Sequence, residues 1–84
     1  MSQIIFKYKG DEYLIQCQIK EKMSKVVEGF YNKSLVPRGS VYFLYNGDLL
    51  DSEITEDKIR PNEQNKKLIL VFDINDQNIK IMIQ

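Results

Sequence analysis

Residues 35–47, LVPRGSVYFLYNG, decide the fold of this 84-residue chain. Pro37 cannot continue a helix, and Val36 before it is restricted to extended geometry, so a preceding helix must end here. The residues that follow alternate and are rich in β-branched and aromatic side chains, which predicts a strand. Asn46-Gly47 is a strong signal for a tight hairpin turn. The stretch therefore predicts a helix end, a loop, a strand and a turn, in that order.

The segment LVPRGS, residues 35–40, also matches letter for letter the thrombin site engineered into expression vectors. A vector-derived segment would have to be excluded from reasoning about the fold. We interpret the segment as a structural loop, because it lies inside the chain, after what we interpret as a native start at Met1. Without these residues the helix would have no room to reach the strand. An engineered replacement of the same length is the alternative.

The N-terminal part of the chain has a period of two around a turn at residues 9–12 and predicts a β-hairpin with one buried face. The positions expected on that buried face are Ile4, Phe6, Tyr8, Tyr13, Ile15, Cys17 and Ile19. We interpret Cys17 as a small core side chain.

Residues 21–34 change to a helical period. Their apolar stripe consists of Met23, Val26, Val27 and Phe30. Ser24 is the only good candidate for an N-cap, yet the stripe requires Met23 before it, so we expect a poorly capped helix.

Beyond the hairpin turn, Leu49 and Leu50 predict a very short fourth strand. The polar stretch that follows holds two apolar anchors, Ile54 and Ile59, and we expect one helical turn near residues 55–59. The acidic cluster in this region fits no calcium-binding loop, and we interpret it as solvated surface. Its members are Asp48, Asp51, Glu53, Glu56 and Asp57.

Residues 68–72, LILVF, are apolar at every position, as expected of a strand that is covered on both faces or central in its sheet. Further on, Ile79, Ile81 and Ile83 alternate with other residues and predict a sixth strand or the start of a following region. The chain is too short for two cores. The order of elements predicts an α+β roll, in which a mixed sheet of four to five strands packs on one central helix.

The composition argues against several classes of function. Twelve basic and twelve acidic residues give a formal net charge of zero, which argues against nucleic-acid binding by phosphate neutralisation. The chain has no His and one Cys, so it lacks the commonest general base and the ordinary zinc ligands. We therefore predict a non-enzyme with no catalytic residue, no cofactor and no metal. The absence of a membrane span or signal peptide predicts an intracellular protein, cytoplasmic or nuclear.

The ordered set of elements resembles the ubiquitin-like β-grasp family, most closely its SUMO-like branch, over roughly residues 3–73. The helix of that family ends at a short proline-containing loop, which is followed by a strand of the form apolar-x-aromatic-apolar-aromatic-x-Gly; residues 35–47 match this pattern. The segments DLLDSEIT and LILVFDIND resemble the SUMO-type segment after the glycine and the final strand. The resemblance implies a ubiquitin-like domain over residues 1–73 and a C-terminal extension over residues 74–84.

Two departures from the family pattern qualify what the resemblance implies. Modifiers of the family end in Gly-Gly, whereas no glycine follows Gly47 here. The implied function is therefore a non-conjugated interaction module, part of a larger protein. A modifier made as a precursor and an assembly domain whose C-terminal strand pairs between chains are the alternatives. The SUMO-type peptide groove beside the second strand also has fewer basic residues, so we expect a weaker preference for acidic peptides. Its residues here are Leu14, Gln16, Gln18, Lys25 and Lys33.

The alternation predicts an apolar patch on the sheet face opposite the helix, which soluble monomers seldom leave bare. By the resemblance, Leu44, with Gly47 beside it, lies where ubiquitin carries its principal docking isoleucine. We expect this patch to bind protein partners of the ubiquitin- or SUMO-binding type, with no nucleic acid or membrane involved and a monomer favoured over a homo-oligomer. The predicted binding residues are Ile5, Leu44, Gly47, Leu68, Leu70 and Phe72.

Two other interpretations of this face stay open. In one, residues 74–84 cover the face or extend the sheet. In the other, the strand register is shifted by one residue, which exchanges the two faces.

Overall fold

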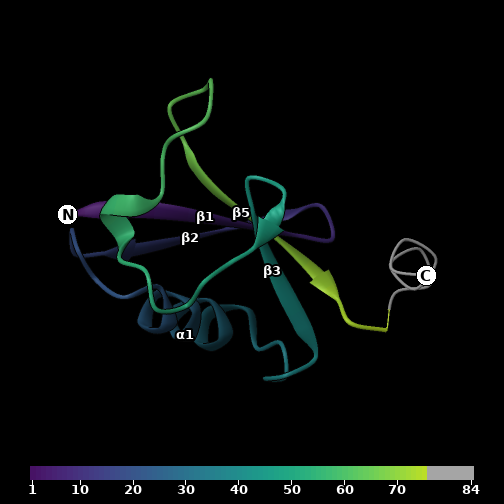
Figure 1. Ribbon diagram of the computed structural model, residues 1–84. Helices are drawn as coiled ribbons and strands as arrows, with labels where there is room; N and C mark the ends of the chain where they lie inside the picture. Colours follow the sequence, from purple (N-terminus) through teal and green to yellow (C-terminus); the bar gives the residue numbers. More distant parts are fainter. Residues whose placement is uncertain (76–84) are drawn as a thin grey trace.

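The computed structural model describes residues 1–75 and shows a five-stranded sheet with one α-helix against it (Figure 1). The elements in chain order are β1 (Ser2–Tyr8), β2 (Asp11–Cys17), α1 (Met23–Ser34), β3 (Val41–Tyr45), β4 (Asp48–Leu49), the 3₁₀ turn η1 (Glu56–Lys58) and β5 (Lys67–Asp73). The strands lie in the order β2-β1-β5-β3-β4. The β1–β5 pair is parallel and the other pairs are antiparallel.

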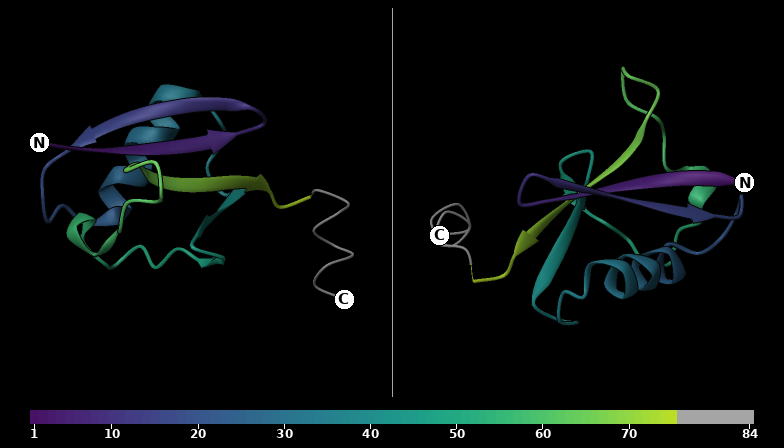
Figure 2. Two further views of the ribbon diagram at one scale, coloured as in Figure 1. Left: turned by 90° about the horizontal axis from the view of Figure 1, so that it is seen from above. Right: turned by 180° about the vertical axis from the view of Figure 1, so that it is seen from behind.

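The helix α1 lies along one face of this sheet, as the views from above and from behind show (Figure 2). Two layers, a mixed sheet and a single helix confirm the predicted α+β class. The strand β5 is central, as its unbroken apolar run predicted. The predicted alternation at Ile79, Ile81 and Ile83 lies outside the described residues.

The β1–β2 hairpin keeps the predicted buried face except at its end, although its turn has only two residues, Lys9 and Gly10, because Asp11 and Glu12 belong to β2. The inner positions Ile4 and Phe6 are fully buried, and Ile15 and Cys17 are buried opposite them. The prediction that Ile19 continues this face was wrong, because its side chain is 63% exposed. The amide of Glu21 donates to the carbonyl of Gln18 at 3.1 Å, and this turn lifts Ile19 off the inner face.

The start of α1 has no side-chain cap, as the sequence predicted. Backbone groups of the later loop replace the cap. The amide of Met23 donates to the carbonyl of Ile54 and that of Ser24 donates to the carbonyl of Ser52, each at 2.9 Å. Two of the amides that every helix leaves without an internal partner are thereby satisfied. The helix start and the loop after β4 consequently form one unit.

The core is built around Phe30 of α1. Its ring stacks on Phe6 at a centroid distance of 5.0 Å and meets Tyr13 and Phe43 edge-on at 5.5 and 5.7 Å. Offset-stacked and edge-on geometries are the favoured arrangements of aromatic pairs. The predicted anchor Ile59 is 1% exposed and joins this core.

The segment that matches a thrombin site forms the connection between α1 and β3, as a structural loop would. The helix ends with Leu35 in the left-handed region, at φ 63°, and its amide donates to the carbonyl of Tyr31. The amide of Ser40 then donates to the carbonyl of Pro37 at 3.2 Å, which closes a turn with Gly39 at φ 82°.

Two predictions in the polar connection need correction. The short fourth strand is Asp48–Leu49, one residue earlier than predicted, because the turn at Asn46 and Gly47 has only two residues. Glu56 is not solvated surface: it is buried, and its carboxylate pairs with Lys67 at 2.5 Å.

Within residues 1–75, no group of three His, Cys, Asp or Glu side chains could hold a metal ion.

Candidate functional site

The sheet face opposite α1 carries apolar side chains from three neighbouring strands. The register pairs Ile5 of β1 with Leu68 of β5, and Leu44 of β3 with Leu70 of β5. Tyr42 pairs with Phe72 in the same way. Side chains of residues paired across strands point to the same face of a sheet. We call this set the outer face: Ile5, Tyr42, Leu44, Leu68, Leu70 and Phe72.

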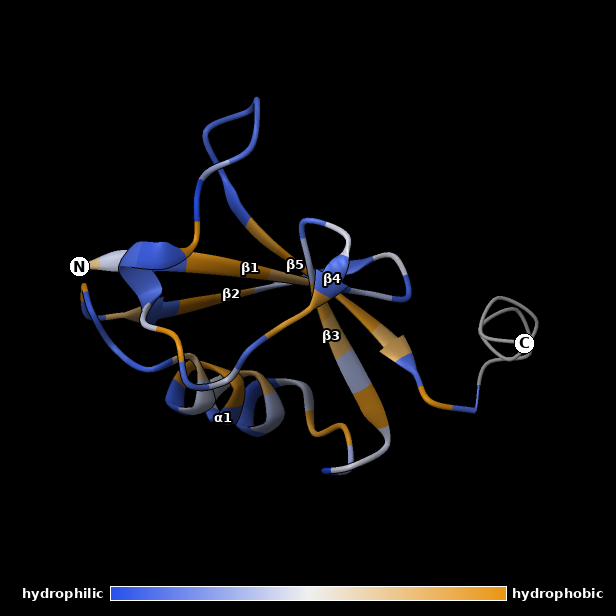
Figure 3. Ribbon diagram, viewed as in Figure 1, coloured by the Kyte–Doolittle hydropathy of each residue, from blue (hydrophilic) through white to orange (hydrophobic). Residues whose placement is uncertain are grey.

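The hydropathy colouring shows how the apolar residues are distributed (Figure 3). Apolar segments run along β1, β3 and β5, whereas the loop that joins η1 to β5 is polar. This polar loop borders the outer face, because Arg60, Pro61 and Asn62 line the same depression as Leu44 and Leu68.

The side chains of the outer face differ in exposure. Leu70 is 36% exposed, while Leu44, Leu68 and Phe72 are half-buried. The expectation that Ile5 is part of an exposed patch was wrong, because only 6% of it is exposed. The strand β1 is interior to the sheet, and Leu14 and Leu68 lie on either side of Ile5. Ile5 therefore lies between these two leucines and offers a partner little surface.

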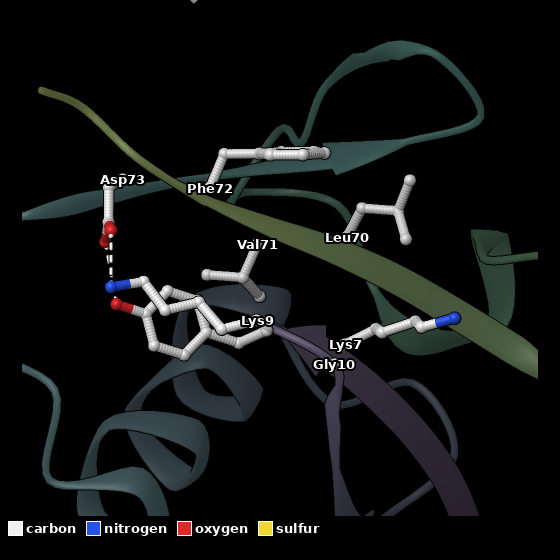
Figure 4. A pocket seen from close by; sticks show the side chains of 8 residues that line it. Lys7, Lys9, Gly10, Leu70, Val71, Phe72 and Asp73 are labelled. Carbon is white, nitrogen blue, oxygen red and sulfur yellow. Dashed lines mark hydrogen bonds and ion pairs between the residues drawn. The ribbon is translucent and has the colours of Figure 1, made fainter. Parts of the chain in front are cut away.

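Leu70 lines two shallow depressions on the outer face. One is lined by Lys7, Lys9, Leu70, Phe72 and Asp73, among others (Figure 4). In this view Leu70 and Phe72 project to one side of β5 and Val71 to the other. The second depression lies between Leu44, Gly47, Leu68 and Leu70. Leu70 is consequently the residue common to both halves of the candidate site.

The β3–β4 turn keeps the second depression open. Asn46 and Gly47 both have positive φ, 55° and 86°, as a type I′ hairpin requires. No heavy atom beyond the chain neighbours lies within 4 Å of the place where a Cβ on Gly47 would stand. A partner could therefore come close to the backbone at this end of the face.

Sequence reasoning did not assign Leu49 to this site. It lies directly across from Leu44 in the β3–β4 pair and is 72% exposed. The sequence feature that could have identified Leu49 is the two-residue hairpin turn, because this turn fixes which residue of β4 lies opposite Leu44. The register therefore adds an exposed apolar side chain at the edge of the outer face.

Where β1 and β5 end, a small polar cluster joins the two strands. The hydroxyl of Tyr8 donates to Oδ1 of Asp73 at 2.7 Å, and Nζ of Lys9 lies 3.0 Å from Oδ2. The hydrogen bond from Tyr8 and the contact with Lys9 lower the pKa of Asp73. The same hydrogen bond raises the pKa of Tyr8. The charges of Lys9 and Asp73 thus compensate each other.

Two further cations border the outer face. Lys7 lines the first depression and Arg60 the second. Among the described residues, neither side chain belongs to an ion pair. The candidate site thus combines an apolar centre with a basic rim, a combination that suits an apolar partner surface with acidic residues around it.

Cys17 is the one cysteine in the sequence. The thiol of Cys17 is buried, and burial, followed by the nearby Glu56 and Glu21, raises its pKa. A thiol with a raised pKa is a poor nucleophile at neutral pH.

Over residues 1–75, no helix combines the length and the apolar character that crossing a membrane requires.

The five-stranded mixed sheet with one helix has a ubiquitin-like α+β arrangement. Among solved structures, the chain is similar to one described as the crystal structure of ATBAG1 in complex with HSP70. The match has a TM-score of 0.70 at 12% sequence identity and covers 99% of this chain and 46% of that chain, so this chain spans about half of its length. No family model and no curated protein matches the sequence.

Proposed function

We propose that the chain is a non-catalytic ubiquitin-like interaction module that binds a protein partner through the outer face. One observation carries this proposal: the register gathers Leu44, Leu68 and Leu70 into one apolar surface that no described segment covers. Exposed apolar patches with a polar rim are typical of protein-binding sites.

The comparison with solved structures supports a protein as the class of partner. The similar structure is described as a complex with HSP70. A ubiquitin-like fold in a protein complex agrees with a binding role for the fold here. Because the two chains share only 12% of their residues, we identify the partner by its chemistry.

We infer a partner of the ubiquitin-binding type, which presents an apolar surface flanked by acidic residues. Its apolar side chains would cover Leu44 and Leu70, and its acidic residues would face Lys7 and Arg60. The charge pairs would mainly set orientation and association rate, whereas the apolar contacts would supply most of the affinity. The SUMO-like resemblance points to a second possible surface, the groove between β2 and α1. We favour the outer face because Lys33 already contacts the backbone of β2 in that groove, at Leu14.

We further propose that the module acts inside the cell. Its single cysteine, Cys17, is a buried free thiol. Chains that fold in oxidising compartments typically rely on disulfides at this size.

Site-specific photo-crosslinking would test the proposed face. A photoreactive amino acid would replace Leu49, which is exposed next to Leu44. A matched control would carry it at Asn32, on the exposed side of α1. We expect a discrete cross-linked protein from position 49 and none from position 32. That product should disappear when Leu44→Ala and Leu70→Ala are added. The same product from both positions, or its persistence in the double alanine variant, would contradict the proposal.

A further inference from the structure

The strand β2 forms one edge of the sheet, and the backbone polar groups of every second residue in it point away from β1. The β1–β2 turn consists of two residues, Lys9 and Gly10, both with positive φ. In a two-residue hairpin the residue pair next to the turn, here Tyr8 and Asp11, is hydrogen-bonded. Hydrogen-bonded and non-hydrogen-bonded residue pairs then alternate along the antiparallel ladder. The residues whose backbone groups face the open edge are therefore Glu12, Leu14 and Gln16.

A side chain from the helix occupies the middle of this edge. Nζ of Lys33, in the last turn of α1, donates to the carbonyl oxygen of Leu14 at 2.8 Å. An added strand would need this carbonyl for its own amide and would have to displace the lysine. Natural sheets commonly use lysine to keep exposed edges from pairing with other chains. Here the lysine comes from the neighbouring helix.

The sequence of β2 shows which strand the edge would otherwise accept. In an antiparallel pair of two β2 strands centred on Leu14, Leu14 of each copy lies opposite Leu14 of the other. Glu12 then lies opposite Gln16, and Tyr13 opposite Ile15. No like charges lie opposite each other in this arrangement. Tyr13 and Ile15, which lie opposite each other on the helix-facing side, are both apolar, and such cross-strand pairs stabilise the association of two strands.

We propose that Lys33 closes the β2 edge against the β2 strand of a second copy of this chain. The ammonium group of Lys33 occupies the backbone acceptor at the centre of the two-fold pairing. In addition, two copies would bring two such cations close together on the same edge. This role is independent of the proposed binding function, because it concerns the edge of the sheet and not the outer face.

The test compares Lys33→Ala with the wild-type chain and with Lys25→Ala. Both variants remove one positive charge from an exposed position of α1 and introduce the best helix former. Light scattering over a concentration series would report the mass, and circular dichroism would verify the fold. We expect the mass of Lys33→Ala to rise from one chain towards two with concentration, while the other two proteins stay at one chain.

A second variant assigns any association to the β2 edge. Leu14→Pro, added to Lys33→Ala, removes an amide that points to solvent and leaves the β1–β2 ladder intact. We expect this double variant to return to one chain. The proposal is overturned if Lys33→Ala has the same mass as wild type, if Lys25→Ala associates equally, or if the double variant still associates.

Discussion

Nζ of Lys67 lies 2.5 Å from Oε1 and 3.0 Å from Oε2 of Glu56, whose side chain is only 1% exposed. The backbone amide of Glu56 also donates to the carbonyl of Glu21 at 2.7 Å. This residue of η1 therefore connects β5 with the segment before α1. The buried ion pair holds the long connection between β4 and β5 against the core.

Removing the cation of this pair should strongly destabilise the chain. Lys67→Met leaves the carboxylate of Glu56 buried without its counter-charge, and breaking such a pair typically costs about 3 kcal/mol or more. The free energy of unfolding from urea denaturation measures the effect. Lys66→Met, at the exposed neighbouring position, is the control and should change stability little. A loss below about 1 kcal/mol for Lys67→Met would show that the pair contributes little.

Gly29 should be required in the middle of α1, although glycine is a poor helix former. An alanine Cβ at this position would stand 2.9 Å from Cγ2 of Ile15, a methyl group that the branched side chain holds in place. The gain in helix propensity is about 1 kcal/mol, whereas overpacking costs about 1–3 kcal/mol. We expect Gly29→Ala to lower the free energy of unfolding, while Asn32→Ala on the exposed side raises it or leaves it unchanged. Stabilisation by Gly29→Ala would mean that α1 does not pack closely on β2.

The sequence predicted the two layers, the helix and the succession of helix and strands along the chain, because each depends on a local period or turn. The apolar stripe of α1 and the alternation in β1 both appear in the structure as predicted. Two features depend on partners far away in sequence and could not be predicted this way. Glu56 looks like a surface acid until Lys67 is placed beside it, and the missing cap of α1 is replaced by carbonyls of residues 52 and 54.

The cluster of Tyr8, Lys9 and Asp73 should make stability depend on pH in the acidic range. The pKa of Asp73 is lower when folded, so its contribution is fully present above its ordinary value of about 4. The contribution is lost as the pH falls through the lowered pKa, because the unfolded chain binds the proton first. We expect Asp73→Asn to reduce the acid-induced loss of stability, as measured by urea denaturation at several pH values. Asp11→Asn, at an exposed position in the same hairpin, is the control. An unchanged pH profile in Asp73→Asn would show that the cluster does not influence folding.

The bond between Arg38 and Gly39 should resist thrombin in the folded chain. The turn holds Gly39 at positive φ, and Arg38 contacts Glu28 at 2.5 Å and lies over the ring of Tyr31. Proteolysis requires local opening of a segment held in this way. We expect cleavage to be much slower than that of a free peptide with residues 33–43, as followed by mass spectrometry. Equal rates would show that the loop is open in the native state.

For the candidate site, the alternation along the strands predicted which residues share the outer face but not how exposed each of them is. Leu44, Leu68, Leu70 and Phe72 share one face because each strand has a period of two. The burial of Ile5 follows from its two lateral neighbours, Leu14 and Leu68, which only the strand order reveals. Predicting that order requires knowledge of which strands pair over long distances.

The central claim is that the outer face binds the partner, and one affinity measurement tests it most directly. The partner identified by cross-linking would be titrated calorimetrically with wild type, with Leu44→Ala/Leu70→Ala, and with Leu35→Ala. Leu35 is an exposed leucine at the end of α1 and is the matched control. We predict at least about a tenfold loss of affinity for the double variant, because residues at the centre of an interface dominate binding, and wild-type affinity for Leu35→Ala. An unchanged affinity of a folded double variant would contradict the account.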